Sequence, residues 1–279
     1  MKTKKQGIKE ILAEFLSKEE TALVPSSYDI VGDILIFIDF PEELEKKEKK
    51  IAKVFLDYFK NINVVLKKTG QYSGKFRTPK MKVLAGEKRK ETIHKENNVR
   101  IKLDVEKVYF SPRTSNERLR LSKQIKKNES ILVMFSGSAV LPIVLSKNTD
   151  AKEIYAVEIN PIAHKYAEEN IGLNKISNIT LYNGDVDEIL PTIKKKFDRV
   201  AMPLPKGGED YLELAISKIK KNGIIHFYDF LNEKDFPLAK EKVKKACDNI
   251  KAKFKIIDLV KCGQYAPYTY RVCVDFKVL

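Results

Sequence analysis

Four short apolar runs, each followed by a helical pattern, place the strongest constraint on how this chain folds. They occupy the stretch from Ser130 to about Pro205. β-Branched residues gather in each run, small or acidic residues stop it, and helical spacing follows. This alternation is typical of a parallel sheet with crossover helices. Ligands of the nucleotide type bind such sheets at the carboxyl ends of the strands, so the residues after each run are the first candidates for a site.

The residues that end these runs have the chemistry of a nucleoside-binding edge. The first run leaves into Ser136-Gly137-Ser138, where backbone N–H groups can approach an anionic or zwitterionic ligand. Glu158 ends the second run and can accept both hydroxyls of a ribose, and Asp185 after the third run suits an adenine amino group. The fourth run ends in Met202-Pro203-Leu204-Pro205, a stiff turn that lacks two N–H donors.

These features fit more than one class of ligand. A nicotinamide-binding domain shares the small-residue loop and Glu158, but it is expected to have a second glycine where Ser138-Ala139 stand. The acidic residue after the third run and the proline-rich turn after the fourth favour S-adenosylmethionine, and hence a methyltransferase. Another dinucleotide-binding protein and an α/β domain without a ligand remain as alternatives.

The charge of the chain indicates a polyanionic partner. Its 53 Lys and Arg outnumber its 38 Asp and Glu, which gives a formal net charge of +15. Clustered cations release phosphate counterions on binding, so nucleic acid is the expected partner, and a general excess of solvated lysines is the alternative. The candidate phosphate contacts are the basic clusters at 45–53, 65–68, 75–90 and 123–127.

The remaining composition predicts a soluble protein without a metal site. Cys247, Cys262 and Cys273 have no CxxC spacing and the three histidines are scattered, so neither a metal site nor a disulfide framework is expected. No apolar run reaches membrane-spanning length. A reducing, cytoplasmic setting is therefore expected. The protein is also expected to act as a monomer.

The chain is predicted to hold two domains. Up to residue 107 the pattern is α+β: SYDIVGDILIFIDF predicts two strands around a Gly-Asp turn, and ETIHKENNVRIKLDV predicts a hairpin turning at Asn97-Asn98. The last two strands of the chain are predicted to pair antiparallel at a sheet edge, a feature of the methyltransferase version of this fold. The predicted fold class is thus α/β: a class I methyltransferase, Rossmann-like sheet at 108–279, preceded by a smaller α+β accessory or RNA-binding domain at 1–107.

Four motifs in order carry a resemblance to a known family. They are VYFSPRTSNERLRL, AVEINPIAHKYAEENIGLNK, MPLPKGGEDYLELA and NGIIHFYDF. They resemble the archaeal and eukaryotic tRNA (guanine37-N1)-methyltransferases, and the resemblance runs from about residue 60 to the C-terminus. It implies a Rossmann-fold domain that binds S-adenosylmethionine and methylates N1 of guanosine 37 in the tRNA anticodon loop. It also implies a further small domain that checks the tRNA elbow, for which this chain is too short.

The resemblance assigns roles to residues by motif. Glu117 matches the catalytic carboxylate and is the implied general base for the N1 proton. Arg77 matches an arginine near guanine O6, where charge develops, and Arg113 or Arg118 orders the site. The implied substrate-binding residues are Arg77, Arg113, Arg118 and Pro205. The predicted cofactor-binding residues are Tyr109, Phe135, Gly137, Glu158, Ile159, Asn160, Asp185, Val186, Pro203 and Leu204.

The chain departs from the family pattern at two places, and three alternatives stay open. The loop reads FSGSAVL where the family has FAGxGPF, and Pro203 stands where the family has the asparagine of NLP, so base orientation rests more on Arg77 and Glu117. Tyr265 is a candidate to stack on a flipped base. The alternatives are a bifunctional enzyme that also C-methylates the wyosine precursor imG-14, an aminocarboxypropyl transferase of that pathway, and a catalytically silent tRNA-binding module.

Overall fold

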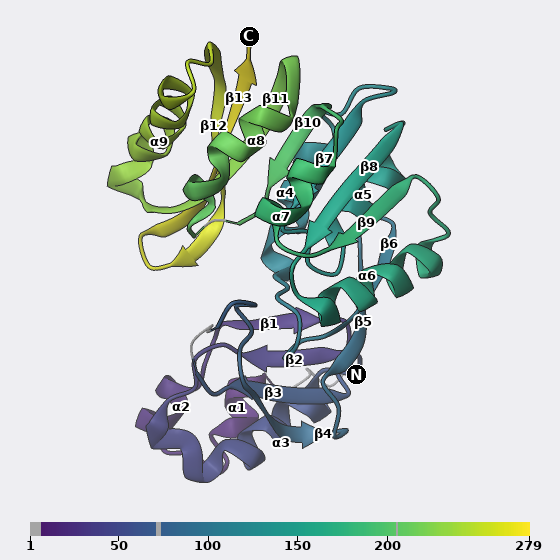
Figure 1. Ribbon diagram of the computed structural model, residues 1–279. Helices are drawn as coiled ribbons and strands as arrows, with labels where there is room; N and C mark the ends of the chain where they lie inside the picture. Colours follow the sequence, from purple (N-terminus) through teal and green to yellow (C-terminus); the bar gives the residue numbers. More distant parts are fainter. Residues whose placement is uncertain (1–6, 71–73, 205) are drawn as a thin grey trace, which may run out of the picture. The chain divides into compact units, whose positions relative to one another are not determined.

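The computed structural model of the protein describes residues 7–70, 74–204 and 206–279. The chain divides into two compact units, both drawn in Figure 1. The first consists of Met1–His94 with Lys102–Pro112, and the second of Lys95–Ile101 with Arg113–Leu279. The division falls within one β-hairpin, formed by β5 (Glu91–Glu96) and β6 (Val99–Asp104).

The first unit is an α+β domain built on a four-stranded sheet of order β1-β2-β3-β4. β2 runs parallel to β3, and the outer pairs β1–β2 and β3–β4 are antiparallel. Its strands are β1 (Tyr28–Val31), β2 (Ile34–Phe37), β3 (Val64–Lys68) and β4 (Met81–Gly86). Its helices are α1 (Ile8–Leu12), α2 (Lys18–Leu23), the 3-10 turn η1 (Glu42–Lys47) and α3 (Glu48–Tyr58). Leu12 and Phe55 of the helices pack with Leu35 and Phe37 of the sheet to form its core.

Two turns, one in each unit, follow from residues that tolerate a left-handed backbone. The predicted Gly-Asp turn joins β1 to β2, and Gly32 has a φ of 59° there. The predicted turn at Asn97 and Asn98 joins β5 to β6 with φ values of 42° and 63°. Asparagine accepts this conformation more readily than other residues that carry a Cβ. Both predicted turns are confirmed.

The second unit is built on a seven-stranded sheet of order β12-β13-β11-β10-β7-β8-β9. Neighbouring strands from β11 to β9 are parallel, and β13 runs antiparallel to both β11 and β12. The strands are β7 (Ser130–Met134), β8 (Glu153–Glu158), β9 (Ile179–Asn183), β10 (Phe197–Met202), β11 (Ile219–Asn232), β12 (Phe254–Ala266) and β13 (Thr269–Val278). The predicted antiparallel pair at the sheet edge is confirmed, and so is the predicted α/β fold class.

Helices cover the two faces of this sheet and bury two separate clusters (Figure 1). One cluster joins the strands to α7, α8 and α9, and the other joins them to α4 and α5. The helices are α4 (Ser115–Ser122), α5 (Val140–Asn148), α6 (Pro161–Asn174), α7 (Val186–Thr192), α8 (Leu212–Lys218) and α9 (Phe236–Asn249). Three 3-10 turns connect them, η2 (Pro112–Thr114), η3 (Gly208–Tyr211) and η4 (Glu233–Asp235).

The strand order reverses between β7 and β10, and this reversal locates the site. From β7 the chain crosses outward to β8 and β9 and then returns to place β10 on the other side of β7. A ligand of an open α/β sheet binds outside the carboxyl ends of the strands at such a switch point. The loops after β7, β8, β9 and β10 therefore enclose the candidate site. No helix in the described part of the chain is long and apolar enough to cross a membrane.

The turn at Gly32 generates a stability prediction. A Cβ at this position would lie 2.2 Å from Thr92 Oγ1 and 2.7 Å from the Ile93 carbonyl oxygen, and the φ of +59° is costly for a residue with a side chain. We expect Gly32→Ala to lower the free energy of unfolding by about 2 kcal/mol or more, measured by urea titration. Gly70→Ala is the control, because a Cβ there meets nothing within 4 Å. Equal stabilities of the two variants would contradict the prediction.

Candidate active site

The carboxyl edge of the parallel strands brings three predicted loops together. β7 pairs with β8 up to Met134 and Val157, and β8 pairs with β9 up to Glu158 and Asn183. The loop that begins at Phe135, the carboxylate of Glu158 and the turn before α7 therefore follow adjacent strand ends.

The loop after β7 is held in a left-handed backbone over alternate residues. Phe135, Gly137 and Ala139 have φ values of 57°, 58° and 61°. Ser136 N–H donates to the carbonyl oxygen of Val157 at 2.9 Å, and this bond fixes the loop against the end of β8. Non-glycine residues with positive φ cluster where a backbone is shaped for a ligand.

Glu158 ties this loop to the second strand. Its Oε2 accepts the N–H of Gly137 at 2.6 Å, and its Oε1 accepts the N–H of Asn160 at 2.8 Å. The residue is 9% exposed. Burial raises the pKa of Glu158, although the N–H groups of Asn160 and Gly137 act in the opposite direction. The carboxylate is thus oriented by the backbone, and each oxygen keeps acceptor capacity for a ligand hydroxyl.

Asn160 starts the helix that follows β8. Its side-chain oxygen caps α6 by accepting the N–H groups of Ile162 at 3.0 Å and Ala163 at 3.4 Å. Pro161 occupies the first turn, where its missing N–H costs nothing. Asn160 and Pro161 therefore fix the point at which the backbone leaves the end of β8. Ile159, between Glu158 and Asn160, is half-buried.

Asp185 stands at the corresponding place after β9. Its side chain caps α7 by accepting the N–H of Asp187 at 3.2 Å. The N–H of Gly184 and the side-chain amide of Asn183 both donate to the carbonyl oxygen of Glu158, at 3.0 and 2.8 Å. These bonds hold the ends of β8 and β9 together. Val186 is 4% exposed and packs in the core below this edge.

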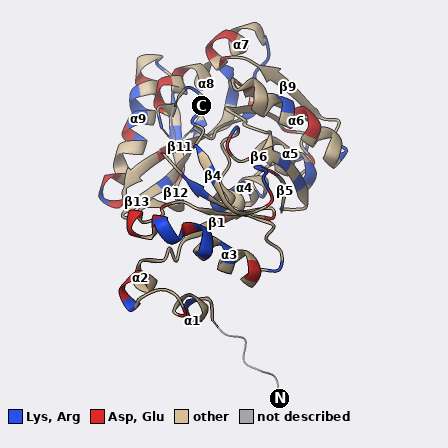
Figure 2. Cartoon of the chain, turned by 90° about the horizontal axis from the view of Figure 1, so that it is seen from below, with Lys and Arg blue, Asp and Glu red and all other residues tan. Residues whose placement is uncertain are grey.

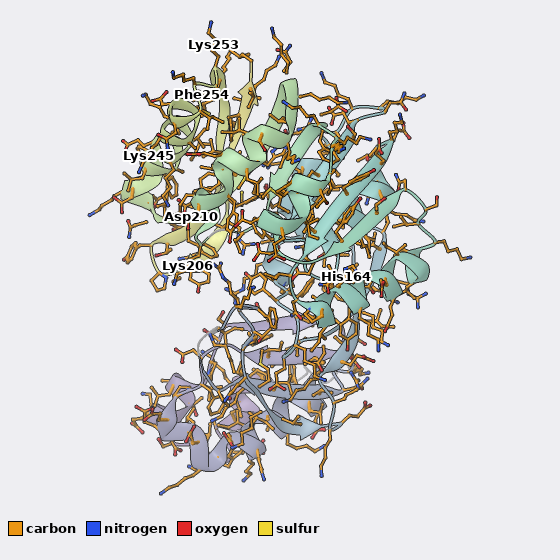
Figure 3. All side chains as sticks on the ribbon, viewed as in Figure 1. His164, Lys206, Asp210, Lys245, Lys253 and Phe254 are labelled. Atoms are coloured by element: carbon orange, nitrogen blue, oxygen red, sulfur yellow. The ribbon has the colours of Figure 1, made fainter. Side chains whose placement is uncertain are left out.

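The turn after β10 closes the other side of the edge. Leu204 N–H donates to the Met202 carbonyl oxygen at 2.7 Å, so Pro203 lies at the centre of a three-residue turn. Pro205 falls outside the described residues. Figure 3 labels Lys206 and Asp210, which follow this turn, and His164, which lies in the first turn of α6. Phe135 meets Tyr211 edge to face, with ring centroids 5.0 Å apart.

The loop after β7 contains two buried hydroxyls that fit a polar ligand. The Oγ atoms of Ser136 and Ser138 are buried and have no hydrogen-bond partner among the residues that the structure describes. A buried polar atom is normally paired, so these hydroxyls are suited to a ligand's polar groups. With the oriented carboxylate of Glu158 on the next strand, the edge fits a nucleoside cofactor.

Glu117 lies in the first turn of α4 and its carboxylate is buried, with the residue 6% exposed. Arg120 forms a bidentate ion pair with this carboxylate: Nε donates to Oε2 at 2.7 Å and NH2 donates to Oε1 at 2.7 Å. The hydroxyl of Tyr228 donates to Oε1 at 2.6 Å. Tyr228 directly follows Phe227, the β11 partner of Met202, so this hydrogen bond places Glu117 beside the carboxyl end of β10.

A second carboxylate shares the same guanidinium. Asp275 of β13 accepts NH1 of Arg120 at 2.6 Å and the side-chain amide of Gln124 at 3.0 Å, both on Oδ2. Its Oδ1 lies 2.6 Å from His226 Nδ1. Burial raises the pKa of Asp275, but the hydrogen bonds from His226 and Arg120 outweigh it and hold the pKa well below its usual range.

The histidine in this network has an assigned tautomer. Arg199 NH1 lies 2.8 Å from His226 Nε2, and a guanidinium can only donate, so Nε2 accepts and Nδ1 carries the hydrogen that Asp275 receives. Burial lowers the pKa of His226, although Asp275 acts in the opposite direction. His226, Cys273 and Asp275 offer ligand atoms within 4.8 Å of one another, but two guanidinium groups already contact this cluster, which disfavours a metal cation.

The other predicted residues are distributed over both units. Arg118 pairs with Glu96 of β5, with Nε and NH2 both at 2.5 Å from its carboxylate oxygens. Arg113 lies in η2 and belongs to the second unit. Arg77 and Tyr109 belong to the first unit, where Arg77 lies in a turn with a φ of 49°.

Family comparison agrees with this arrangement. Residues 92–257 match the TRM5/TYW2 methyltransferase domain, and residues 8–89 match the TYW2 N-terminal domain. The chain belongs to the TRM5/TYW2 methyltransferase family.

Curated relatives of this TRM5/TYW2 methyltransferase include enzymes with two different activities. The tRNA (guanine(37)-N(1))-methyltransferase Trm5b of Pyrococcus abyssi is 39% identical over 94% of this chain and 77% of that enzyme. The tRNA(Phe) (4-demethylwyosine(37)-C(7)) aminocarboxypropyltransferase of Pyrococcus horikoshii is 32% identical over 98% of this chain and 97% of that enzyme.

Solved structures of family members have the same fold. The complex of aTrm5 with tRNALeu aligns with a TM-score of 0.85 and 33% identity, covering 99% of this chain and 79% of that one. The TYW2 of P. horikoshii in complex with MeSAdo aligns with a TM-score of 0.81 and 29% identity, covering 98% of both chains.

The buried polar network around Glu117 was not predicted from the sequence. Arg120, His226, Tyr228 and Asp275 were absent from the predicted site, as was Arg199. The signal was present, because charged residues interrupt the apolar strands that contain Arg199 and Asp275. A charge in a buried strand requires a partner, and pairing these charges with one another would have located the network.

The buried histidine of this family member generates a prediction of pH dependence. The pKa of His226 is lowered in the folded protein, so the unfolded chain binds a proton that the folded chain excludes. We expect the stability that this group contributes to be present above about pH 6.5 and to fall as the pH drops below it, by about 1.4 kcal/mol per pH unit at most. Urea unfolding at pH 7.5 and 5.5 measures it, with His226→Gln as the comparison. The same pH dependence in both proteins would contradict the prediction.

Proposed function

We propose that this chain transfers a methyl group from S-adenosylmethionine to N1 of guanosine 37 in the tRNA anticodon loop. The observation that carries the proposal is the buried carboxylate of Glu117 in the SPRTSNER motif, paired with a guanidinium beside the carboxyl end of β10. A carboxylate that hydrogen bonds hold in one orientation is suited to accept a proton as a general base.

The cofactor is assigned to the edge formed by the loops after β7, β8 and β9. Glu158 would accept the ribose hydroxyls, the backbone of the Gly137 loop would approach the zwitterionic end, and Asp185 would face the adenine. The turn at Pro203 and Leu204 would border the site, with Ile159, Val186, Phe135, Asn160 and Tyr109 around it. When bound, S-adenosylmethionine supplies an electrophilic methyl group on a sulfonium.

The protein's own chemistry is a proton transfer with charge stabilisation. The lone pair on N1 of guanine becomes available when the N1 proton leaves, and Glu117 accepts that proton. Negative charge then develops on O6, and a guanidinium stabilises it; this role goes to Arg77. Arg113 orders the site, and Arg118 and Pro205 contribute to binding of the substrate.

We assign residues 1–107 to RNA binding and residues 108–279 to catalysis. Figure 2 shows Lys and Arg on helices such as α3 and α9, with Asp and Glu between them. The formal net charge of +15 favours association with the phosphate backbone through such positions. The enzyme is proposed to act as a monomer in the cytoplasm.

The hairpin formed by β12 and β13 is proposed to hold the unstacked anticodon loop. β11 pairs with the end of β10 at Phe227 and then continues to Asn232. β13 pairs with β11 over this extension, up to Thr269 opposite Asn232. At this end the Tyr265 ring stacks on Phe230 with centroids 4.1 Å apart, and Tyr265 is 51% exposed. Its free face suits a nucleobase, because aromatic rings bind unpaired bases by stacking.

Aminocarboxypropyl transfer at position 37 is the second candidate function. The observation that favours it is the match of residues 8–89 to the TYW2 N-terminal domain, together with the 98% coverage of the P. horikoshii TYW2 chain. The carboxylate base favours methyl transfer, since a reaction at a ring nitrogen that bears a proton needs a base. C-methylation of imG-14 in addition to N1 methylation is the third outcome to be tested.

The test of function is incubation with labelled S-adenosylmethionine and tRNA transcripts that carry guanosine, adenosine or inosine at position 37, followed by nucleoside mass spectrometry. We expect 1-methylguanosine from the first transcript. Glu117→Gln is expected to lower the single-turnover rate by roughly 100-fold or more, because the base is lost. An aminocarboxypropyl product, on a transcript that carries the wyosine precursor, would support the second candidate. A wild-type rate for Glu117→Gln would overturn the base assignment.

The hairpin generates a prediction on substrate binding. We expect Tyr265→Ala to raise KM for tRNA roughly tenfold, because one base loses its stacking partner, with little change in kcat. Tyr265→Phe retains the ring and is expected to behave as the wild type. Cofactor affinity, measured by calorimetry, is expected to be the same in all three proteins. A loss in both variants, or in neither, would contradict stacking.

A further inference from the structure

We propose that Arg120 and Tyr228 are positioning residues for methyl transfer, which occupy three acceptor positions of the Glu117 carboxylate and leave one on Oε2 to receive the substrate proton. The inference rests on the proposed function, in which Glu117 is the base. It concerns residues of the second unit alone.

The hydrogen bonds to Glu117 are unequally divided between its two oxygens. A carboxylate has about four acceptor positions, two on each oxygen. Oε1 receives the Tyr228 hydroxyl and NH2 of Arg120, while Oε2 receives Nε of Arg120. Among the hydrogen bonds within the described chain, one position therefore stays open, and it lies on Oε2. The asymmetry selects which oxygen reacts.

Tyr228 is the donor in its hydrogen bond to Glu117. Burial raises the pKa of Tyr228 well above its usual value, and Cys273 and Glu117 raise it further. The phenol therefore keeps its proton and directs it at Oε1. This hydrogen bond therefore orients the Glu117 carboxylate through Oε1.

Arg120 is held so that it cannot follow the carboxylate. Its NH1 donates to Asp275, and Asp275 is in turn fixed by His226 and Gln124. Burial lowers the pKa of Arg120, but the hydrogen bonds to Glu117 and Asp275 raise it overall. The guanidinium is thus a permanent cation shared between two carboxylates, and its pull on Glu117 is weaker than that of an unshared cation.

The groups that face Glu117 come from four elements. Arg120 is on α4 itself, Tyr228 and His226 are on β11, and Asp275 and Cys273 are on β13. Burial raises the pKa of Cys273 well above its usual value, and the neighbouring Cys262 of β12 raises it further, so Cys262 completes the set.

The test is the pH dependence of the single-turnover rate of Tyr228→Phe on guanosine-37 tRNA. A base must be ionised, so the wild-type rate falls on the acidic side. Removal of one donor to the ionised carboxylate is expected to move this acidic limb to higher pH by about one unit, which makes the variant roughly tenfold slower below the limb. KM for tRNA and the cofactor Kd are expected to stay unchanged.

The matched control is Tyr155→Phe, which removes a phenol from β8 of the same sheet, where the ring packs on Tyr182 and Phe197. Its profile is expected to overlay that of the wild type. An unshifted limb in Tyr228→Phe would overturn the inference. If Tyr228→Phe does not fold, Arg120→Lys replaces it: lysine keeps the charge but cannot hold both oxygens, and a rate at least tenfold lower with intact cofactor binding is expected. A wild-type rate for Arg120→Lys would overturn the inference.

Glu117→Gln distinguishes failure of the base assignment from failure of the positioning inference. If it retains the wild-type rate, the proposed base is wrong and positioning falls with it. If it is inactive while Tyr228→Phe keeps the wild-type limb, the base assignment stands and the positioning inference alone is overturned.

Discussion

The sharing of one buried guanidinium between two carboxylates is the interaction on which the catalytic unit depends. Arg120 links Glu117 at the start of α4 to Asp275 on β13. Asp275 lies 155 residues after Arg120 in the sequence. It therefore fixes the helix that carries the proposed base to a strand near the sheet edge. A buried ion pair stabilises little by itself, because desolvation offsets the attraction, but it specifies one arrangement of the groups that it joins.

The nucleoside-binding edge has a different physical basis. There the backbone forms most of the site: N–H groups orient Glu158, and positive φ values shape the loop after β7. Side-chain caps then start α6 and α7. A rigid edge assembled from strand ends and helix starts needs few charged side chains. The unit thus combines a backbone-built site for a nucleoside with a side-chain network around a carboxylate.

The sequence predicted the elements of the fold better than the contacts of the site. Periodicity and turn chemistry anticipated the parallel strands, the Asn97-Asn98 hairpin and the antiparallel strands at the edge, because these depend on local patterns. Strand ends located Glu158 and Asp185 for the same reason. The pairing of Glu117 with Tyr228 joins residues 111 apart, and no local pattern encodes it. The roles of these residues in binding and catalysis stay predictions.

The full burial of Arg199 constrains how this chain can diverge. The residue is 1% exposed, and its guanidinium contacts Glu129 from one side and His226 from the other. Loss of any one partner strands a charge in a medium that solvates it poorly. A substitution of Arg199, Glu129 or His226 must therefore be accompanied by compensating substitutions of its partners. Family members that retain the reaction should accordingly keep all three residues or change them together.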